Sequence, residues 1–550
     1  MPAVVRRRFF ASIVDNNWTA SAALALLHLT LSLLAFHQAP ATGGDDAAYV
    51  SLARSIIERR DYTNIGDPAL LPHTQYPPVF PAIVSVGLLA NLAPSLGLRI
   101  LAMVISALAV FASCLWLRRV ASPGIAFCAG FFIAISPEII RLGQIVLSDG
   151  AFWCFSILAL LAWHRSEVAG KRPDGERGVM PLNLVIAASL LTLLAYFTRA
   201  AGAPLLLAVF IWLGLMRQPR ALVVLAALSV PCIFAWWYRG QASGAESYLA
   251  PFIAIDPYNP SLGSVAPPDL VKRAVDNASV YASRQLSRLV LGTPTSGAAF
   301  GLVFAAVTLY GWARRARKVS LPEIWFALYL TLVLLWPVTW SGARFLLPVV
   351  PLIALYVAET VATAVRRGTY PKVYPVAAFV AASVAVFPAL RNQVQYASGC
   401  RAQFAAGERF PCTDPVFSDF LKTAEMSRGK LPTDAVVLSR KPTIFHHYSG
   451  YRSRVYPMFA EPDSLFRVAE RVGARYIVAD RMSNLATKYL MPVLVARRDD
   501  FCVMPELSTT NATLLRIEVG GPRSVPGAAP GVFRVCDAGS RATYQLAVHR

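Results

Sequence analysis

The sequence has little charge and few acidic residues. Only 15% of its 550 residues are charged, while 56% are hydrophobic and the mean hydropathy is +0.49. No soluble protein of this size has such a composition, so we expect a chain that crosses a membrane many times. The sequence also has no CxxC pair and no Cys/His spacing of the kind that holds a metal ion. These absences argue against a soluble enzyme and against a cysteine-based metal centre.

The formal net charge of +21 comes from 52 Lys and Arg against 31 Asp and Glu. Such an excess is also found in nucleic-acid-binding proteins. Here, however, most basic clusters stand in short stretches between apolar segments, which is typical of the cytosolic loops of a membrane protein. We therefore expect the lipid bilayer, and no nucleic acid, as a partner.

Hydropathy and the positive-inside rule together predict about eleven membrane spans. Arg6–Arg8 place the N-terminus in the cytosol, and the apolar run after them is longer than a signal-peptide core, so we expect an uncleaved first helix. The short apolar stretch 79–93 decides the topology, because the later basic clusters all become cytosolic only if it dips into the interface without crossing. The predicted spans are 17–36, 97–117, 122–138, 147–164, 181–198, 200–216, 221–238, 297–313, 322–340, 345–365 and 372–390.

The composition changes near residue 391, which separates a predicted transmembrane domain (1–390) from a C-terminal domain (391–550). Short segments in the second part alternate in type, which predicts a small α/β domain outside the cytosol. It contains no nucleophile elbow and no phosphate loop. The expected strands are 434–440, 475–480 and 492–497, and the expected helices are 441–450 and 462–474.

Eight cysteines fall into two groups, four in apolar spans and four in the C-terminal domain. Four cysteines allow three pairings. We expect the local one, Cys400 with Cys412 and Cys502 with Cys536. Disulfides would mean that this domain faces an oxidising compartment.

The stretch from Gly43 to Pro81 follows the first span and is predicted to lie outside the cytosol. It opens with two adjacent acids, Asp45 and Asp46, at the membrane face, where a carboxylate is costly to desolvate and is often functional. From Asp46 to Arg60 the pattern is helical but too short and too polar to span. We expect this helix to lie along the membrane surface.

The order Asp-Asp-x-x-Tyr-x-x-x-Ala-Arg, then a loop, then Tyr-Pro-Pro-x-x-Pro resembles the first external loop of the GT-C superfamily. These are integral-membrane glycosyltransferases that use polyprenyl-phosphate sugars, and the similarity is greatest to protein O-mannosyltransferases and lipid A aminoarabinose transferases. The resemblance implies that Asp45 is the catalytic base, that Tyr49 and Arg54 lie near it, and that Tyr76 belongs to a loop that closes on the donor. The aminoarabinose transferases carry a lysine just before the proline pair, where this chain has Gln75 and Tyr76.

Three charged residues from later segments are predicted at the same external face. Asp149 opens the span 147–164, Arg199 lies in the turn between two spans, and Arg344 starts the span 345–365. We expect them to converge with Asp45 and Asp46 and, together with Arg54 and His73, to line one cavity that binds the substrates. The sequence Arg-Phe-Leu-Leu-Pro after Ala343 resembles a family motif whose arginine would meet the lipid phosphate, a role that suits the guanidinium fork. The alternatives stay open: Asp46 and Asp149 would be helix N-caps, and Arg344 a snorkelling interfacial side chain.

The predicted function is transfer of a sugar from a polyprenyl-monophosphate donor to an acceptor hydroxyl, with inversion and with Asp45 as general base. The acceptor would be an envelope glycan, lipid or protein outside the bacterial cytoplasmic (inner) membrane. No cofactor is expected, although a divalent cation held by Asp45, Asp46 and Asp149 is the alternative. The rival functions are a transporter or flippase and a scaffold without catalysis.

Overall fold

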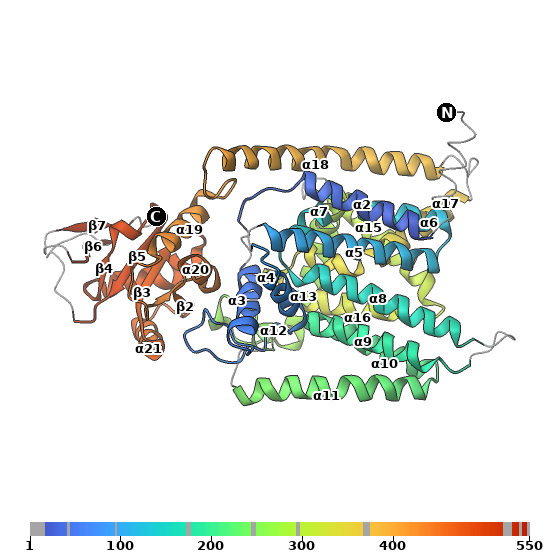
Figure 1. Cartoon of the computed structure of the whole chain (residues 1–550), viewed down its shortest axis with the longest axis horizontal. Helices are drawn as coiled ribbons and strands as arrows, with labels where there is room; N and C mark the ends of the chain where they lie inside the picture. The colour runs from blue at the N-terminus through green and yellow to red at the C-terminus, as the bar shows by residue number, and fades with distance from the viewer. Residues whose placement is uncertain are drawn as a thin grey trace.

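The computed structural model describes residues 17–40, 44–93, 96–171, 178–243, 249–292, 298–366, 374–520, 531–537 and 542–546. It has two parts (Figure 1): a bundle of long, roughly parallel helices and, at one end of it, a smaller domain built on a seven-stranded sheet. Arg6–Arg8, on which the predicted orientation of the N-terminus depends, lie outside the described residues.

Each predicted span contains a helix. Within the described residues, three stretches are long and apolar enough by themselves to cross a membrane, namely Gly97–Val120, Pro219–Gln241 and Ala343–Val365. The bent pair α6 (Pro123–Ile135) and α7 (Pro137–Gly143) is a fourth if it forms one span. The total of about eleven crossings therefore stays a prediction. The helices are α2 (Asn17–Leu34), α5 (Gly97–Val120), α6 (Pro123–Ile135), α8 (Ser148–Ala169), α9 (Leu182–Thr198), α10 (Ala203–Leu215), α11 (Pro219–Ser243), α15 (Ala298–Ala316), α16 (Leu321–Leu335), α17 (Val350–Arg366) and α18 (Tyr374–Ala405).

Interhelical hydrogen bonds and close approaches between helix backbones help to hold the bundle together. Helices in a bilayer gain little hydrophobic free energy from association, so close packing and interhelical hydrogen bonds matter more. The buried Trp163 indole donates a hydrogen bond to Thr192 Oγ1 at 3.0 Å, which joins α8 to α9. A Cβ atom at Gly311 would lie 2.5 Å from the Tyr356 carbonyl oxygen, so α15 and α17 approach more closely there than a side chain would permit.

The first loop, predicted to be external, forms two short helices, α3 (Asp45–Glu58) and α4 (Val79–Leu89). They pack on each other and on the start of α5 through buried side chains that include Tyr49, Phe80 and Leu98. The 11 residues of α4 rise about 16 Å, roughly half of the 30 Å hydrocarbon core. At this length α4 does not cross the core by itself, and the topology in which the segment dips into the interface stays a prediction. The later loops add α12 (Leu249–Ile253), α13 (Pro267–Val280), the π-helix η3 (Tyr281–Gln285) and α14 (Leu286–Leu291).

The C-terminal domain is a mixed sheet in the order β2-β1-β3-β5-β4-β6-β7. β1 pairs in parallel with β2 and β3, whereas β5 runs antiparallel to β3 and β4. Side chains of β3 alternate between the two faces, with Val478 packed in a cluster with α19 and α20, and Ile477 in one with α21 and α22. The strands are β1 (Val436–Leu438), β2 (Arg452–Arg454), β3 (Ala474–Asp480), β4 (Phe501–Val503), β5 (Ala512–Ile517), β6 (Val532–Val535) and β7 (Thr543–Gln545). The helices are α19 (Pro415–Ser427), α20 (Pro442–Ser449), α21 (Pro462–Val472) and α22 (Met491–Ala496).

Two predicted strands and both predicted helices of this domain are confirmed, but the predicted strand at 492–497 is wrong. That segment belongs to α22 and continues from the helical turn at Ala486–Leu490. A run of about six apolar residues has no period that distinguishes a strand from a buried helix.

The connection between the two parts is helical. α18 continues through the predicted boundary at residue 390 and ends at Ala405, where it reaches the C-terminal domain (Figure 1). The disulfide Cys400–Cys412 joins the end of α18 to the segment before α19, and Cys502–Cys536 joins β4 to the residue after β6. Both predicted cysteine pairs are confirmed.

The predicted topology can be tested with two engineered thiols in a chain whose four free cysteines are replaced by alanine. Ser261→Cys lies between α12 and α13, in a loop predicted to be external, and Arg220→Cys lies at the exposed start of α11, which is predicted to be cytosolic. A membrane-impermeant maleimide added to spheroplasts should label only the first thiol. Labelling of both should follow permeabilisation, and labelling at position 220 before it would contradict the topology.

Candidate active site

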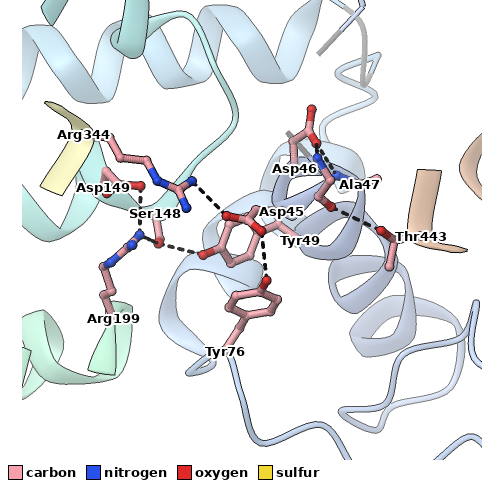
Figure 2. Close-up of polar contacts among 11 residues, drawn as sticks. Asp45, Asp46, Ala47, Tyr49, Tyr76, Ser148, Asp149, Arg199, Arg344 and Thr443 are labelled. Atoms are coloured by element: carbon pink, nitrogen blue, oxygen red, sulfur yellow. Dashed lines mark hydrogen bonds and ion pairs between the residues drawn. The ribbon is translucent and has the colours of Figure 1, made fainter. Parts of the chain in front are cut away.

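Asp45, the first residue of α3, is held between two side chains from distant segments (Figure 2). Arg344 Nη1 donates to its Oδ2 at 2.9 Å, across 299 residues of sequence, and the Tyr76 hydroxyl donates to its Oδ1 at 3.0 Å. Both partners of the ion pair keep 29% of their side-chain surface exposed. The carboxylate is therefore fixed in direction and still reachable from solvent.

Tyr49 lies one turn after Asp45 and joins the first loop to α8. Its hydroxyl shares a hydrogen bond of 2.7 Å with Ser148 Oγ, and its ring packs against the rings of Tyr76 and Phe80 at 5.0 and 4.8 Å. The side chain is 3% exposed. Tyr49 thus ties the position of α3 to the bundle.

Asp149 and Arg199 form a second ion pair beside the first (Figure 2). Arg199 Nη1 donates to Asp149 Oδ2 at 2.8 Å and to Ser148 Oγ at 3.2 Å. Arg199 directly follows α9, and Asp149 lies in the first turn of α8. Asp149 accepts this bond and is not the N-cap, which is Leu147.

The two arginines share one aromatic ring. The guanidinium carbons of Arg199 and Arg344 lie 5.2 and 5.0 Å from the centroid of the Phe345 ring, within the range of cation–π attraction. The Phe345 carbonyl in turn accepts a hydrogen bond from the buried Tyr329 hydroxyl at 2.9 Å. The Phe345 ring thus holds the guanidinium groups of Arg199 and Arg344 close together.

Asp46 points away from this group (Figure 2). Its Oδ1 accepts hydrogen bonds from the amides of Gly44 and Ala47 at 3.1 and 2.9 Å, and the residue is 7% exposed. Burial raises the pKa of its carboxyl, while the amide of Ala47 acts in the opposite direction. Asp46 therefore bonds backbone amides at the start of α3, but it is not the N-cap, which is Gly44.

Arg54 and His73 do not join Asp45 either. Arg54 lies near His446 and His447 of α20, and its charge helps to lower the pKa values of both, after the larger effect of burial. His73 Nε2 accepts a hydrogen bond from the Tyr76 amide at 2.9 Å, and the two rings are stacked. Arg54 therefore does not line the predicted common cavity. His73 instead supports the loop that carries Tyr76.

Four supporting residues were not predicted. Ser148 and Phe345 are direct sequence neighbours of predicted site residues, and their contacts appear only in three dimensions. Tyr62 donates from its hydroxyl to the Tyr76 carbonyl at 2.8 Å, and Arg239 Nη2 donates to the Tyr62 carbonyl at 2.7 Å. An arginine at the end of an apolar span was the only sequence signal for Arg239.

The three carboxylates considered for a cation do not form a common ligand set. Both oxygens of Asp45 and one of Asp149 accept bonds from Arg or Tyr, and Asp46 points elsewhere. Among the described residues, the one group with converging ligand atoms is Cys502, Glu518 and Cys536, and its two sulfurs are bonded to each other.

Comparisons with known proteins identify the fold. The chain matches no protein-family model and no curated protein sequence. It superposes on the oligosaccharyltransferase of Archaeoglobus fulgidus tethered to an acceptor peptide, with a TM-score of 0.55 and 13% identity over 92% of this chain and 74% of that one. It also superposes on ArnT from Cupriavidus metallidurans bound to undecaprenyl phosphate, with a TM-score of 0.52 and 15% identity over 92% and 98%.

A third similar structure is AglB, the oligosaccharyltransferase of Archaeoglobus fulgidus, in complex with an inhibitory peptide and a dolichol-phosphate. The TM-score is 0.54 and the identity 15%, over 88% of this chain and 72% of that one. All of these are GT-C glycosyltransferases, so the chain has the GT-C fold that the first-loop motifs predicted.

The Asp149–Arg199 pair should be needed for stability, because its side chains are only 4% and 16% exposed. Asp149→Asn or Arg199→Met leaves the other charge unpaired and should cost about 3 to 5 kcal/mol. The double variant should lose less than the sum, because no lone charge remains. The measurement is thermal unfolding in detergent. Lys272→Met, which breaks the exposed pair with Asp276, should behave like the unchanged protein, and additive losses at 149 and 199 would refute the coupling.

Proposed function

We propose that this membrane protein is a glycosyltransferase that moves a sugar from a polyprenyl-monophosphate to an acceptor hydroxyl, with Asp45 as general base. The observation that carries the proposal is the ion pair between Asp45 and Arg344, which sets a base beside a cation on the exposed end of the bundle. The GT-C fold supports it, as do the polyprenyl phosphates bound to ArnT and AglB.

In the proposed reaction the acceptor oxygen attacks the anomeric carbon from the side opposite to the phosphate. A carbon–oxygen bond forms to the acceptor, the bond between the anomeric carbon and the phosphate oxygen breaks, and its electron pair goes to the phosphate. The acceptor proton goes to the Asp45 carboxylate, which must lie within about 3 Å of the hydroxyl. The sugar is inverted, and no general acid is required because phosphate is a good leaving group.

Arg344 has a double role in this proposal. A phosphate group binds a guanidinium more strongly than a single carboxylate oxygen does, because it offers two oxygens to the planar fork. The arriving donor phosphate would take Arg344 and release Asp45 Oδ2 for the acceptor proton. Tyr76 would keep Oδ1 fixed during this exchange, since its hydroxyl bonds that oxygen separately.

The proposed orientation places the site and the C-terminal domain outside the cytoplasmic membrane of a bacterium. Two disulfides in the C-terminal region support this orientation, because such bonds persist in oxidising compartments. The acceptor would then be an envelope glycan, lipid or protein. The proposed reaction uses no metal ion, in keeping with carboxylates that are bonded to Arg and Tyr side chains.

Asp45→Asn should lower the rate of transfer by about 10²- to 10⁴-fold, because the amide cannot accept the acceptor proton. The measurement is the mass profile of envelope glycans in a deletion strain, which should lack one sugar. The unchanged protein should restore that sugar and Asp45→Asn should not, at equal amounts of protein in the membrane.

Asp434→Asn is the matched control, since Asp434 is exposed in the C-terminal domain. It should restore the sugar fully. Full restoration by Asp45→Asn would eliminate Asp45 as the base. A deletion strain that loses transport of a lipid or solute, with every envelope glycan intact, would favour the transporter alternative.

A further inference from the structure

The C-terminal domain touches the active-site helix at its first turn. Thr443 Oγ1, in the first turn of α20, donates a hydrogen bond to the carbonyl of Gly44, the residue before Asp45, at 3.3 Å (Figure 2). Ala47 of α3 is buried in the same hydrophobic cluster as Ile444 and Phe445. The start of α3 is thus packed between the bundle and the C-terminal domain.

Lys441 enters this contact from the residue before α20. Its Nζ lies 3.8 Å from where a Cβ atom at Gly44 would be, and Gly44 itself has a φ of +91°, a conformation that favours glycine. The Lys441 side chain is half-buried. Among the ion pairs and hydrogen bonds of the described residues, none within 4.0 Å involves its ammonium group.

The charges around Lys441 come from three elements. Burial lowers the pKa of its ammonium group, Arg440 acts in the same direction, and Asp45 and Asp46 of α3 and Asp480 of β3 act against them. The ammonium is therefore within electrostatic range of the proposed base without being neutralised by a direct carboxylate partner. A half-buried cation of this kind attracts an anion.

The charges of the site are balanced before the donor binds, so an additional cation is needed to stabilise the donor phosphate. Asp45 and Asp149 are paired with Arg344 and Arg199, so these four groups together carry no net charge. A departing polyprenyl phosphate develops a second negative charge, which needs a positive group that is not already paired. Among the described residues, Lys441 is a cation that meets this condition close to the start of α3.

We propose that Lys441 of the C-terminal domain binds the phosphate of the donor lipid together with Arg344, so that the active site is built from both domains. This inference rests on the proposed function. It gives the C-terminal domain a direct part in donor binding. The ammonium group could equally bind a negatively charged acceptor. The experiment therefore distinguishes binding of the donor phosphate from binding of an anionic acceptor.

The test measures binding of undecaprenyl phosphate, and of undecaprenol as its phosphate-free control, to the purified full-length protein by native mass spectrometry. Lys441→Met should weaken binding of undecaprenyl phosphate roughly tenfold, the size expected for a charge-assisted hydrogen bond. Binding of undecaprenol should not change. Lys441→Arg should restore most of the loss, and Lys430→Met, at an exposed lysine of the same domain, should have no effect.

The pH dependence of undecaprenyl phosphate binding distinguishes a direct role of the Lys441 charge from a purely structural role of its side chain. Above pH 8 the lipid phosphate is fully ionised, so the affinity of the unchanged protein should fall as the pH rises through the lowered pKa of Lys441. The Lys441→Arg variant should keep its affinity over the same range, because a guanidinium stays charged.

Each other outcome overturns the inference. Equal binding of undecaprenyl phosphate by Lys441→Met and by the unchanged protein would refute it, and a loss of sugar transfer alone would then assign the ammonium to the acceptor. If the unchanged protein binds undecaprenyl phosphate no better than undecaprenol, the proposed function fails and this inference fails with it.

Discussion

The ion pair between Asp45 and Arg344 is the constraint on which the site depends. It joins the first external loop to the start of the segment that continues into α17. Opposite charges near a membrane face are stable only when each compensates the other, because a lone charge there is poorly solvated. The neighbouring pair of Asp149 and Arg199 obeys the same rule. Together the two pairs fix four elements of the bundle around one point without leaving a net charge.

Helix α3 contacts both the helical bundle and the C-terminal domain. On one side Tyr49 bonds Ser148 of α8, and on the other Ala47 packs with Ile444 of α20. Asp45 stands at the end of α3 where both contacts act. The direction of its carboxylate is therefore set by the bundle and by the C-terminal domain at the same time.

Much of this was predictable from local patterns. Hydropathy and the sign of the loop charges were enough to bring Asp45, Asp149 and Arg344 to one face, whereas Tyr76 was predicted only from the resemblance of its Tyr-Pro-Pro motif to the GT-C first loop. The disulfides followed from sequence proximity within one polar region.

What remained unpredicted depends on tertiary packing. Asp46 is next to Asp45 in sequence, but neighbours on a helix point about 100° apart, so their side chains enter different surroundings. Arg54 lies on the surface of α3 that approaches the C-terminal domain. The sequence of the first loop could not predict this contact, because the contact depends on how the two domains pack. The strand predicted at 492–497 failed because short apolar runs have no distinguishing period.

The support of Tyr76 has a consequence for the surrounding bilayer. Its backbone is tied through Tyr62 to Arg239, on helix α11 at one edge of the bundle (Figure 1), where only 17% of the apolar window is buried. A displacement of α11 would act along these hydrogen bonds on the Tyr76 hydroxyl, which bonds Asp45. We therefore expect the thickness and lateral pressure of the bilayer to influence the geometry of Asp45.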